Sequence, residues 1–229
     1  VTATATSSVA TVSGTGSKNL SVGSNTVSVV VTSESGSVKT YTVTVTIKAN
    51  SDATLKSLTV SSGTLSPAFN KDVLIYTLEV PYSVDNITIT GEVNVNTSNV
   101  EGLGSKVLKV GENGFDIVVT AEDKTTKTYN ITVTRKEDSD TSLKSIGVKG
   151  YDIVKVDNNN YTLTVENNVT SVEIIAEALS SVASVSGTGV KSLKVGKNKF
   201  GVIVTAQNGD ISTYNVVITR KASSDATLK

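Results

Sequence analysis

Three acidic side chains lie close together in the sequence and have the chemistry of a calcium site. Glu137, Asp138 and Asp140 fall between two copies of a repeated segment, where oxygen ligands from two domains could converge. The other junctions between copies carry fewer acids, Asp52 and Asp225. Because calcium usually takes about six to eight oxygen ligands, we favour solvated linker acids and keep calcium as the weaker alternative.

The chain lacks the residue types that most often act as general base or thiol nucleophile. It contains no His and no Cys, and its acidic residues fall mostly at outward strand positions or in turns. We therefore predict no catalytic residue, no bound cofactor and no enzyme activity.

An isopeptide bond is the other chemistry that the sequence permits, between Lys56 on a first strand and Asn130 on a last strand. Strand alternation places Lys56 out of phase with Leu55 and places Asn130 between two inward residues. Both side chains should face solvent, where the amine stays charged, so we disfavour this bond.

The elements that must position these residues are copies of one pattern. Each copy contains V-x-G-x-G, L-x-V-G-x-N, an alternating apolar run and a T/S-T-Y strand, in residues Val12–Lys48, Val100–Lys136 and Val185–Lys221. A second motif, S-D-x-x-L-K, recurs at Ser51, Ser139 and Ser224. Self-similarity on this scale indicates a tandem array of one folded unit.

The repeat predicts the domain organisation. We expect the later part of a first module at 1–49, complete modules at 50–138 and 139–223, and the start of a further module at 224–229. The incomplete first and last copies suggest that the chain is part of a longer array of such modules.

Apolar residues alternate with polar ones, which predicts strands with one buried face. The middle module should contain about seven strands, at Leu55–Val60, Val73–Val80, Asn86–Gly91, Asn99–Glu101, Val107–Val110, Phe115–Glu122 and Thr126–Arg135. Its predicted core stripes are Tyr76/Leu78/Val80, Phe115/Ile117/Val119/Ala121 and Tyr129/Ile131/Val133. The third module repeats the stripes, and the first repeats two of them as Val27/Val29/Val31 and Tyr41/Val43/Val45. Short strands at this spacing predict an all-β fold of tandem immunoglobulin-like sandwiches arranged as an elongated array.

Turn signals fall between these strands. Asn208-Gly209 marks a hairpin between the last two strands, and Lys124 occupies the matching position without Gly. The recurring G-x-N, as in Gly111 and Asn113, predicts a positive-φ glycine followed by an Asn that bonds to nearby backbone. The G-x-G pairs precede strands and not helices, so they predict tight loops and not a nucleotide site.

Charge and composition exclude some partners. Lys and Arg together number 21, as do Asp and Glu, and no cationic stripe is present, so nucleic acid is not expected. Aromatic residues make up 4% and Trp is absent, which disfavours polysaccharide binding on flat rings. The sequence has neither a signal peptide nor an apolar run long enough to insert in a membrane.

The middle module resembles the bacterial cadherin-like β-sandwich domain. The resemblance rests on L-x-x-L at Leu55, L-S-P-A-F at Leu65, Y-T-L-E-V at Tyr76, A-E-D at Ala121 and T-Y-N-I-T-V-T-R at Thr128. The third module departs from it, with Gly150–Asn160 in place of L-S-P-A-F. The resemblance implies non-catalytic modules, strung along large secreted or cell-surface bacterial proteins, with no shared catalytic residues.

Three functions are compatible with these observations. The first is a structural spacer or stalk, whose main partners are other modules of the same long chain. The second is an adhesive module that binds cell-wall polysaccharide or a surface protein through end loops, with Ser61–Asp72 and Lys149–Asn160 as the regions that differ most. The third is a repeat subunit of an extracellular filament joined through edge strands.

Overall fold

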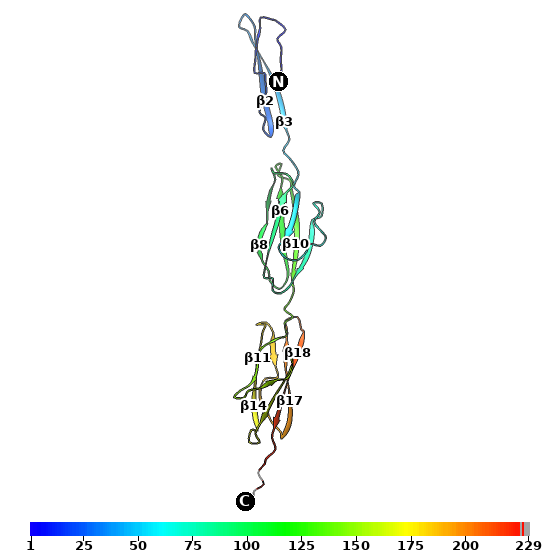
Figure 1. The fold of residues 1–229 in the computed structure, drawn as a ribbon. Coiled ribbons are helices and arrows are strands. Elements are labelled where there is room, and N and C mark those ends of the chain that lie inside the picture. The colour runs from blue at the N-terminus through cyan, green and yellow to red at the C-terminus, as the bar shows by residue number, and fades with distance from the viewer. Residues whose placement is uncertain (225, 227–229) are drawn as a thin grey trace. The chain divides into compact units, whose positions relative to one another are not determined.

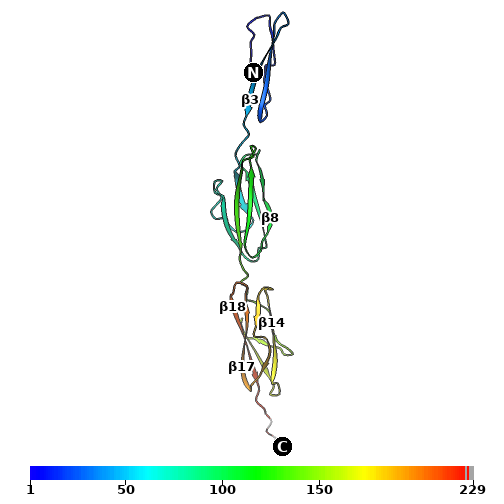
Figure 2. The ribbon, with the colours of Figure 1, turned by 180° about the vertical axis from the view of Figure 1, so that it is seen from behind.

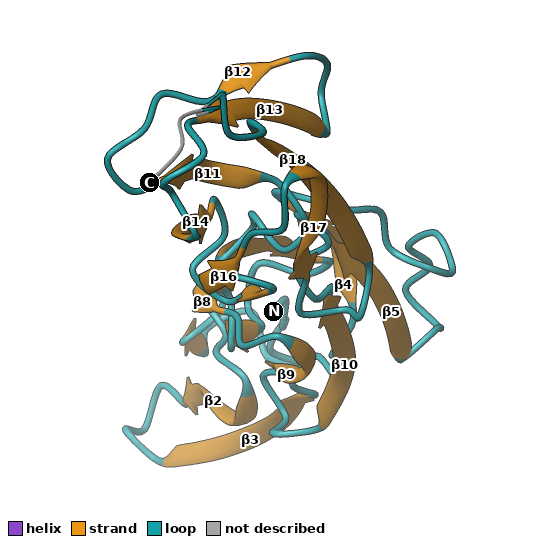
Figure 3. Cartoon of the chain, turned by 90° about the horizontal axis from the view of Figure 1, so that it is seen from below, coloured by secondary structure: helices purple, strands orange, loops and turns teal. Residues whose placement is uncertain are grey.

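The computed structural model describes residues 1–224 and 226, which form strands, turns and loops (Figure 3). Asp225 and residues 227–229, which belong to the predicted start of a further module, lie outside the described residues. The all-β prediction is confirmed, because strands are the regular secondary structure throughout the described chain.

The strands follow one another with short connections, and several are labelled in Figure 1. In chain order they are β1 (Thr11–Ser13), β2 (Gly23–Thr32), β3 (Val38–Ile47), β4 (Leu55–Val60), β5 (Ile75–Val80), β6 (Asn86–Val93), β7 (Asn99–Glu101), β8 (Gly104–Val107), β9 (Gly111–Thr120), β10 (Thr126–Arg135), β11 (Leu143–Val148), β12 (Val154–Lys155), β13 (Asn160–Val165), β14 (Ser171–Ala178), β15 (Ser184–Ser186), β16 (Gly189–Ser192), β17 (Gly196–Thr205) and β18 (Ile211–Arg220).

The strands form sheets whose orders repeat along the chain. The first sheet has the order β1-β2-β3. The next strands form the sheets β4-β6-β8 and β5-β10-β9-β7, and the last form β11-β14-β16 and β12-β13-β18-β17-β15. The last strand of each later copy lies between two others, so β10 and β18 are central strands.

The chain forms two compact units, and the bounds of these units differ from those of the repeated segments. The first comprises Val1–Leu78, Ile87–Lys106 and Gly114–Thr132, and the second Glu79–Asn86, Val107–Asn113 and Val133–Lys229. The module boundaries that the repeat predicts at 49/50, 138/139 and 223/224 stay predictions.

A continuous apolar core fills the last copy of the repeat, between its two sheets. Val148, Val172 and Ile174 from one sheet pack with Val202 and Ile218 from the other. The strands β17 and β18 are paired along their whole lengths and lie side by side in Figure 2. Side chains from two sheets that share one core define a β-sandwich.

The predicted core stripes of residues 50–138 are confirmed at almost every position. Tyr76, Tyr129, Ile131 and Val133 are fully buried, whereas Phe115 at the end of its stripe is only half-buried. Every residue classed as buried in the described chain is apolar or Tyr. Alternation therefore assigns the faces correctly, because successive side chains of a strand point to opposite sides.

The prediction that the first copy buries both of its stripes is wrong in part. Val27 and Val29 are 7% and 4% exposed, but Tyr41 and Val43 are 50% and 42% exposed. This copy contributes one three-stranded sheet, so β3 has little chain packed against its inner face.

The bounds of four strands differ from the prediction. Strand β5 begins at Ile75 and not at Val73, and β6 extends to Val93 and not Gly91. The strand expected at Val107–Val110 is β8, Gly104–Val107, and the strand expected from Phe115 begins at Gly111. The Asn113 side chain accepts a hydrogen bond from the Lys109 backbone N–H (2.9 Å) and donates one to the Lys109 carbonyl (2.8 Å). These bonds turn the chain immediately before β9, so the residues after Val107 cannot continue a strand.

The hairpins between the last two strands have one geometry, whichever residue is in the turn. Gly36, Lys124 and Gly209 all adopt positive φ, at 82°, 75° and 89°. Lys124 is a non-Gly residue with positive φ, so the turn keeps its geometry where Gly is missing.

Gly102 offers a test of the tight-loop interpretation. It has a φ of +89°, and a Cβ at this position would lie 2.1 Å from the Asp116 carbonyl oxygen, whereas Gly104 has similar φ but open space around it. We expect Gly102→Ala to lower the free energy of unfolding by more than Gly104→Ala, whose cost is the backbone strain alone, about 1–2 kcal/mol. Urea unfolding of the two variants measures the difference, and equal losses would contradict a steric role for Gly102.

Candidate functional site

The same set of hydrogen bonds occurs where the chain enters each complete copy. We call this stretch the lead segment; it comprises residues 50–54 in one copy and residues 138–142 in the next. Asn50 donates its backbone N–H to Glu122 Oε2 (2.9 Å) and accepts from the Asp123 backbone N–H (3.1 Å). Its side-chain oxygen also accepts from the Asp52 backbone N–H at 2.8 Å. The first lead segment is thereby fixed to the turn between β9 and β10.

The second lead segment repeats these bonds. Asp138 donates its backbone N–H to Gln207 Oε1 (3.2 Å) and accepts from the Asn208 backbone N–H (3.1 Å). Its carboxylate accepts from the Asp140 backbone N–H at 2.9 Å and from the Ser180 hydroxyl at 2.5 Å. Asp138 therefore occupies the position that Asn50 has in the preceding copy.

Asp52 supplies the carboxylate of the first lead segment. It accepts from the Thr54 hydroxyl (2.6 Å), the Thr54 backbone N–H (2.9 Å) and the Asn94 side-chain amide (2.7 Å). The Thr54 hydroxyl and then the Asn94 amide hold the pKa of Asp52 below its ordinary value, because they bond to the charged form. At Asp138 the bond from Ser180 is the largest cause of a similarly lowered pKa.

Two of the three candidate calcium ligands, Asp138 and Asp140, accept hydrogen bonds from protein groups. Asp140 accepts from the Ser142 backbone N–H at 2.8 Å, and Asp138 is bonded as described above, while Glu137 is exposed. Among the described residues no group of three or more acidic, His or Cys side chains could hold a metal ion. The prediction of solvated linker acids, with calcium at Glu137, Asp138 and Asp140 as the weaker alternative, stays a prediction.

The two residues considered for an isopeptide bond lie on strands of different sheets, β4 and β10. Lys56 Nζ lies 3.3 Å from Glu92 Oε2, with both side chains 67% exposed. Asn130 donates its side-chain amide to Asp116 Oδ1 at 2.6 Å. Each residue points to solvent, as alternation predicts, and has another partner.

Tyr129 shows how the lead segment continues into the core. Its ring is fully buried, its hydroxyl donates to the Lys71 carbonyl (2.7 Å), and it accepts from the Leu55 backbone N–H (3.1 Å). Burial is the main cause that raises the pKa of this hydroxyl. Tyr214 donates similarly to the Thr141 carbonyl at 3.1 Å. In both copies the tyrosine hydroxyl is thus bonded at the rim of the core, whereas Tyr41, the equivalent residue of the first copy, is 50% exposed.

An arginine that the sequence reading overlooked closes each complete copy at the end of its last strand. Arg135 donates to the Tyr82 carbonyl through Nε (2.9 Å) and to the Leu108 carbonyl through Nη1 (3.0 Å). Arg220 donates in the same way to the Asn167 carbonyl (2.7 Å) and the Leu193 carbonyl (3.0 Å). Its recurrence after an apolar residue and a Thr, as V-T-R at Arg135 and I-T-R at Arg220, was the available signal.

The lead segments were also overlooked as hydrogen-bonded structures, although their motif was visible. S-D-x-x-L-K recurs with the repeat, and the Asp side chains at its second position, Asp52 and Asp140, both bond to a backbone N–H two residues later. Asp and Asn side chains commonly make such local turns. Their partners in the distant turn could not be read from the sequence.

The loop between β4 and β5 carries the sequence difference that suggested a binding region. A shallow groove of about 280 Å³ lies here, lined by Leu58, Gly63, Leu65 and Phe69 among others. Phe69 packs near the rings of Tyr76 and Tyr129, with centroids 6.2 and 6.4 Å apart. The groove supplies an apolar surface, and its partner, polysaccharide or protein, stays a prediction.

Fold and site together define a class of protein, a chain of tandem β-sandwiches. Each complete copy has its own apolar core, its own lead segment and its own terminal arginine. A sequence model of the "Cadherin-like beta sandwich domain" matches residues 55–136 and 143–221. The chain therefore belongs to the family of cadherin-like β-sandwich domains.

Individual similarities are weaker. A "Putative membrane protein" of Evansella cellulosilytica is 37% identical over 98 residues, which cover 38% of this chain and 15% of that protein. The chain thus spans a small part of that relative. Among the described residues no helix is long and apolar enough to cross a membrane.

Two solved structures show weak similarity to this chain. The protocadherin GammaB4 extracellular domain is 12% identical over 88% of this chain and 37% of that chain, with a TM-score of 0.33. The fibronectin(III)-like modules of CbhA from Clostridium thermocellum are 12% identical over 76% of this chain and 99% of theirs, with a TM-score of 0.24.

Removing the Tyr129 hydroxyl should destabilise the fold at the first lead segment. Tyr129→Phe leaves the Lys71 carbonyl and the Leu55 N–H without this partner, so we expect a loss of about 1–3 kcal/mol in unfolding free energy. Tyr41→Phe, at the equivalent but half-exposed position, is the matched control and should change little. Urea unfolding measures both, and equal effects would contradict the role of the buried hydroxyl.

The lowered pKa of Asp52 predicts a pH dependence of stability. A folded-state pKa below the unfolded value gives stabilisation that is present above about pH 4 and lost as pH falls through the folded pKa. Asp52→Asn should therefore unfold more easily at pH 7 and lose less stability between pH 5 and pH 3 than the parent chain, in urea titrations at about these pH values. Glu101→Gln changes charge by the same amount at an exposed site and serves as control. An unchanged pH dependence in Asp52→Asn would contradict this assignment.

Proposed function

We propose that this chain is a set of non-catalytic structural modules, acting as a spacer or stalk in a larger secreted or cell-surface bacterial protein. The observation that supports it most is the repetition of the lead segment, bonded through Asn50 in one copy and Asp138 in the next. These bonds fix the start of each complete copy to a turn of that same copy, which suits modules that follow one another along a chain.

The chemistry of the described residues supports a mechanical role over a catalytic one. Their buried residues are apolar or Tyr, and the lowered carboxyl pKa values keep those groups ionised in turns and not poised as acids near neutral pH. Membership of the cadherin-like family and the similarity to part of a described membrane protein support a surface location.

An adhesive role is the second candidate, and the apolar groove beside Phe69 is the observation that favours it. Cell-wall polysaccharide or a surface protein would be the partner. This role is compatible with a stalk, because a groove on one module leaves the connections between modules unchanged.

Solution scattering tests the spacer proposal. Strands of about ten residues span roughly 33 Å, so three modules in a row would be about 90–100 Å long, with a radius of gyration near 27 Å. A compact globule of this chain length would have about 17 Å. A measured value near 27 Å, in the presence and absence of calcium, is the expected result. A value near 17 Å would overturn the spacer proposal.

A further inference from the structure

The outer face of the large sheet in the last copy carries apolar side chains where a sandwich is usually polar. This sheet has the order β12-β13-β18-β17-β15, and four of its strands are labelled in Figure 3. On its outer face Val154 and Val156 are 64% and 62% exposed, and Ile203 and Ile211 are 37% and 65% exposed. Exposed apolar residues gathered on one sheet face indicate a surface that meets a partner.

Strand pairing places these side chains on one surface. Val154 lies opposite Thr162, Thr162 opposite Val217, and Val217 opposite Lys199. Residues directly opposite each other in paired strands point to the same side of a sheet. Val216, which precedes Val217, is fully buried. The row from Val154 to Lys199 therefore points outward, because successive side chains of a strand alternate between the two faces.

Two lysines bring positive charge to the same face. Lys199 belongs to the outward row, and Lys197 lies opposite Thr219 on the same pair of strands. Both lysines are exposed, and within the described part of the chain no acidic side chain lies within ion-pair distance of either one. The face is therefore apolar along β12 and near the hairpin between β17 and β18, and basic toward the start of β17.

The same face of the middle copy is acidic. Its outward strand positions include four exposed acidic residues, Glu79, Glu101, Glu112 and Asp116. At the equivalent positions of the repeat the last copy has no acid, and holds Thr164, Ser186, Lys197 and Gly201. Two threonines of the middle copy are also replaced by apolar residues, Thr126 by Ile211 and Thr132 by Val217. The two copies thus keep one fold and differ in the charge and polarity of one face.

The size of the face sets the strength of a contact that it can make. Neighbouring strands lie about 4.8 Å apart and a strand advances about 3.3 Å per residue, so this sheet presents roughly 500 Å² of outer surface. Two such faces in contact would bury roughly 1,000 Å² in total, at the low end of specific protein interfaces. A contact of this size is reversible, and complementary charge decides which faces meet.

We infer that the outer face of the β12-β13-β18-β17-β15 sheet binds the acidic outer face of the middle copy in a neighbouring chain of the same protein. Lys197 and Lys199 meet the acidic residues, and the apolar residues along β12 exclude water from the contact. Charge complementarity selects this pair of faces, because two basic or two acidic faces repel each other. The inference goes beyond the spacer proposal and does not rest on it.

Two variants of the whole chain isolate this contact. Lys197→Glu with Gly201→Asp gives the last copy the charges that the middle copy has at these positions, and removes its basic face. Glu112→Lys with Asp116→Asn removes the acidic face of the middle copy instead. Position 201 has room for a side chain, because a Cβ on Gly201 would lie 3.4 Å from its nearest neighbour, Thr213 Cγ2. Each variant therefore keeps the face that the other lacks.

Sedimentation equilibrium measures the association at up to about 1 mM protein, in low salt and in about 0.5 M NaCl. We expect the parent chain to associate with a Kd below about 1 mM in low salt, and at least about threefold more weakly in high salt, because exposed charges are screened. Each variant alone should associate at least about tenfold more weakly than the parent chain. An equimolar mixture of the two variants should regain association, since one supplies the acidic face and the other the basic face.

Further variants keep the proposal falsifiable. If Gly201→Asp does not fold, Lys197→Glu with Lys199→Glu changes exposed groups alone and replaces it. Lys144→Glu reverses a charge on β11, in the opposite sheet, and as the control should leave association unchanged. A parent chain that stays monomeric at about 1 mM, a variant that associates like the parent chain, or a mixture no stronger than its components would overturn the proposal. Binding of a soluble anionic polysaccharide by a chain that stays monomeric would assign the face to that polymer and would also overturn it.

Discussion

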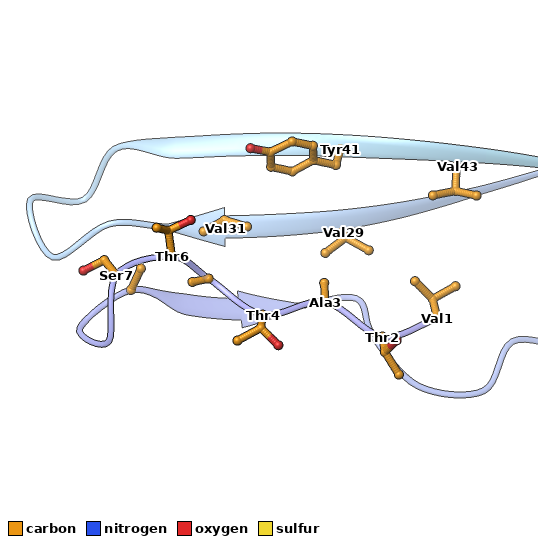
Figure 4. Close-up of a pocket in the computed structure, with 12 residues that line it drawn as sticks. Val1, Thr2, Ala3, Thr4, Thr6, Ser7, Val29, Val31, Tyr41 and Val43 are labelled. Atoms are coloured by element: carbon orange, nitrogen blue, oxygen red, sulfur yellow. The ribbon is translucent and has the colours of Figure 1, made fainter.

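The structure depends on one constraint: each sheet has one apolar face that must be covered by another layer. The last strand of a copy bears most of this requirement, because β10 and β18 are central in their sheets. Tyr129, Ile131 and Val133 of β10 are fully buried, as are Val216 and Ile218 of β18. Burial of a side chain of this size contributes about 1.5–3 kcal/mol. Where the covering layer is present, the stripe is core. In the first copy, whose described strands form the single sheet β1-β2-β3, Tyr41 and Val43 of the same stripe are partly exposed (Figure 4).

Polar interactions then decide how the chain enters and leaves this core. The lead segment bonds to the turn between the last two strands, the tyrosine hydroxyl joins the lead to the core, and the terminal arginine binds two loop carbonyls at the other end of its strand. All three are built on backbone groups of loops, which would otherwise lack partners near the core. Their recurrence in both complete copies makes them properties of the module and not of one local sequence.

Much of the fold could be predicted from the sequence, and the reason lies in its periods. The two-residue alternation identified the inward faces of β5, β9 and β10, and the repeat identified equivalent residues such as Tyr129 and Tyr214. The repeat alone matched Lys124 to the hairpin position of Gly209, but its positive φ came from the structure. The site was harder to predict. The partners of Asn50 and Arg135 lie some 70 and 53 residues away, and no local pattern encodes a contact at that distance. The start of β9 was missed because the Asn113 side chain, and not an apolar residue, determines where that strand begins.

The parallel pairing of β13 with β18 has a consequence for the order in which a module forms. Asn160 and its partner Asn215 are separated by most of the module's length, so this part of the sheet cannot close until the last strand has been synthesised. Contacts between residues far apart in sequence form slowly, because the entropy of closing the intervening loop is lost before they are made. A chain that emerges from a ribosome or an export channel with its N-terminus first can pair β13 with β12, but the other edge of β13 stays open until β18 follows. In a long array, each module completes its fold as a unit after the module before it. The module that is still emerging therefore has a sheet edge that lacks its partner strand.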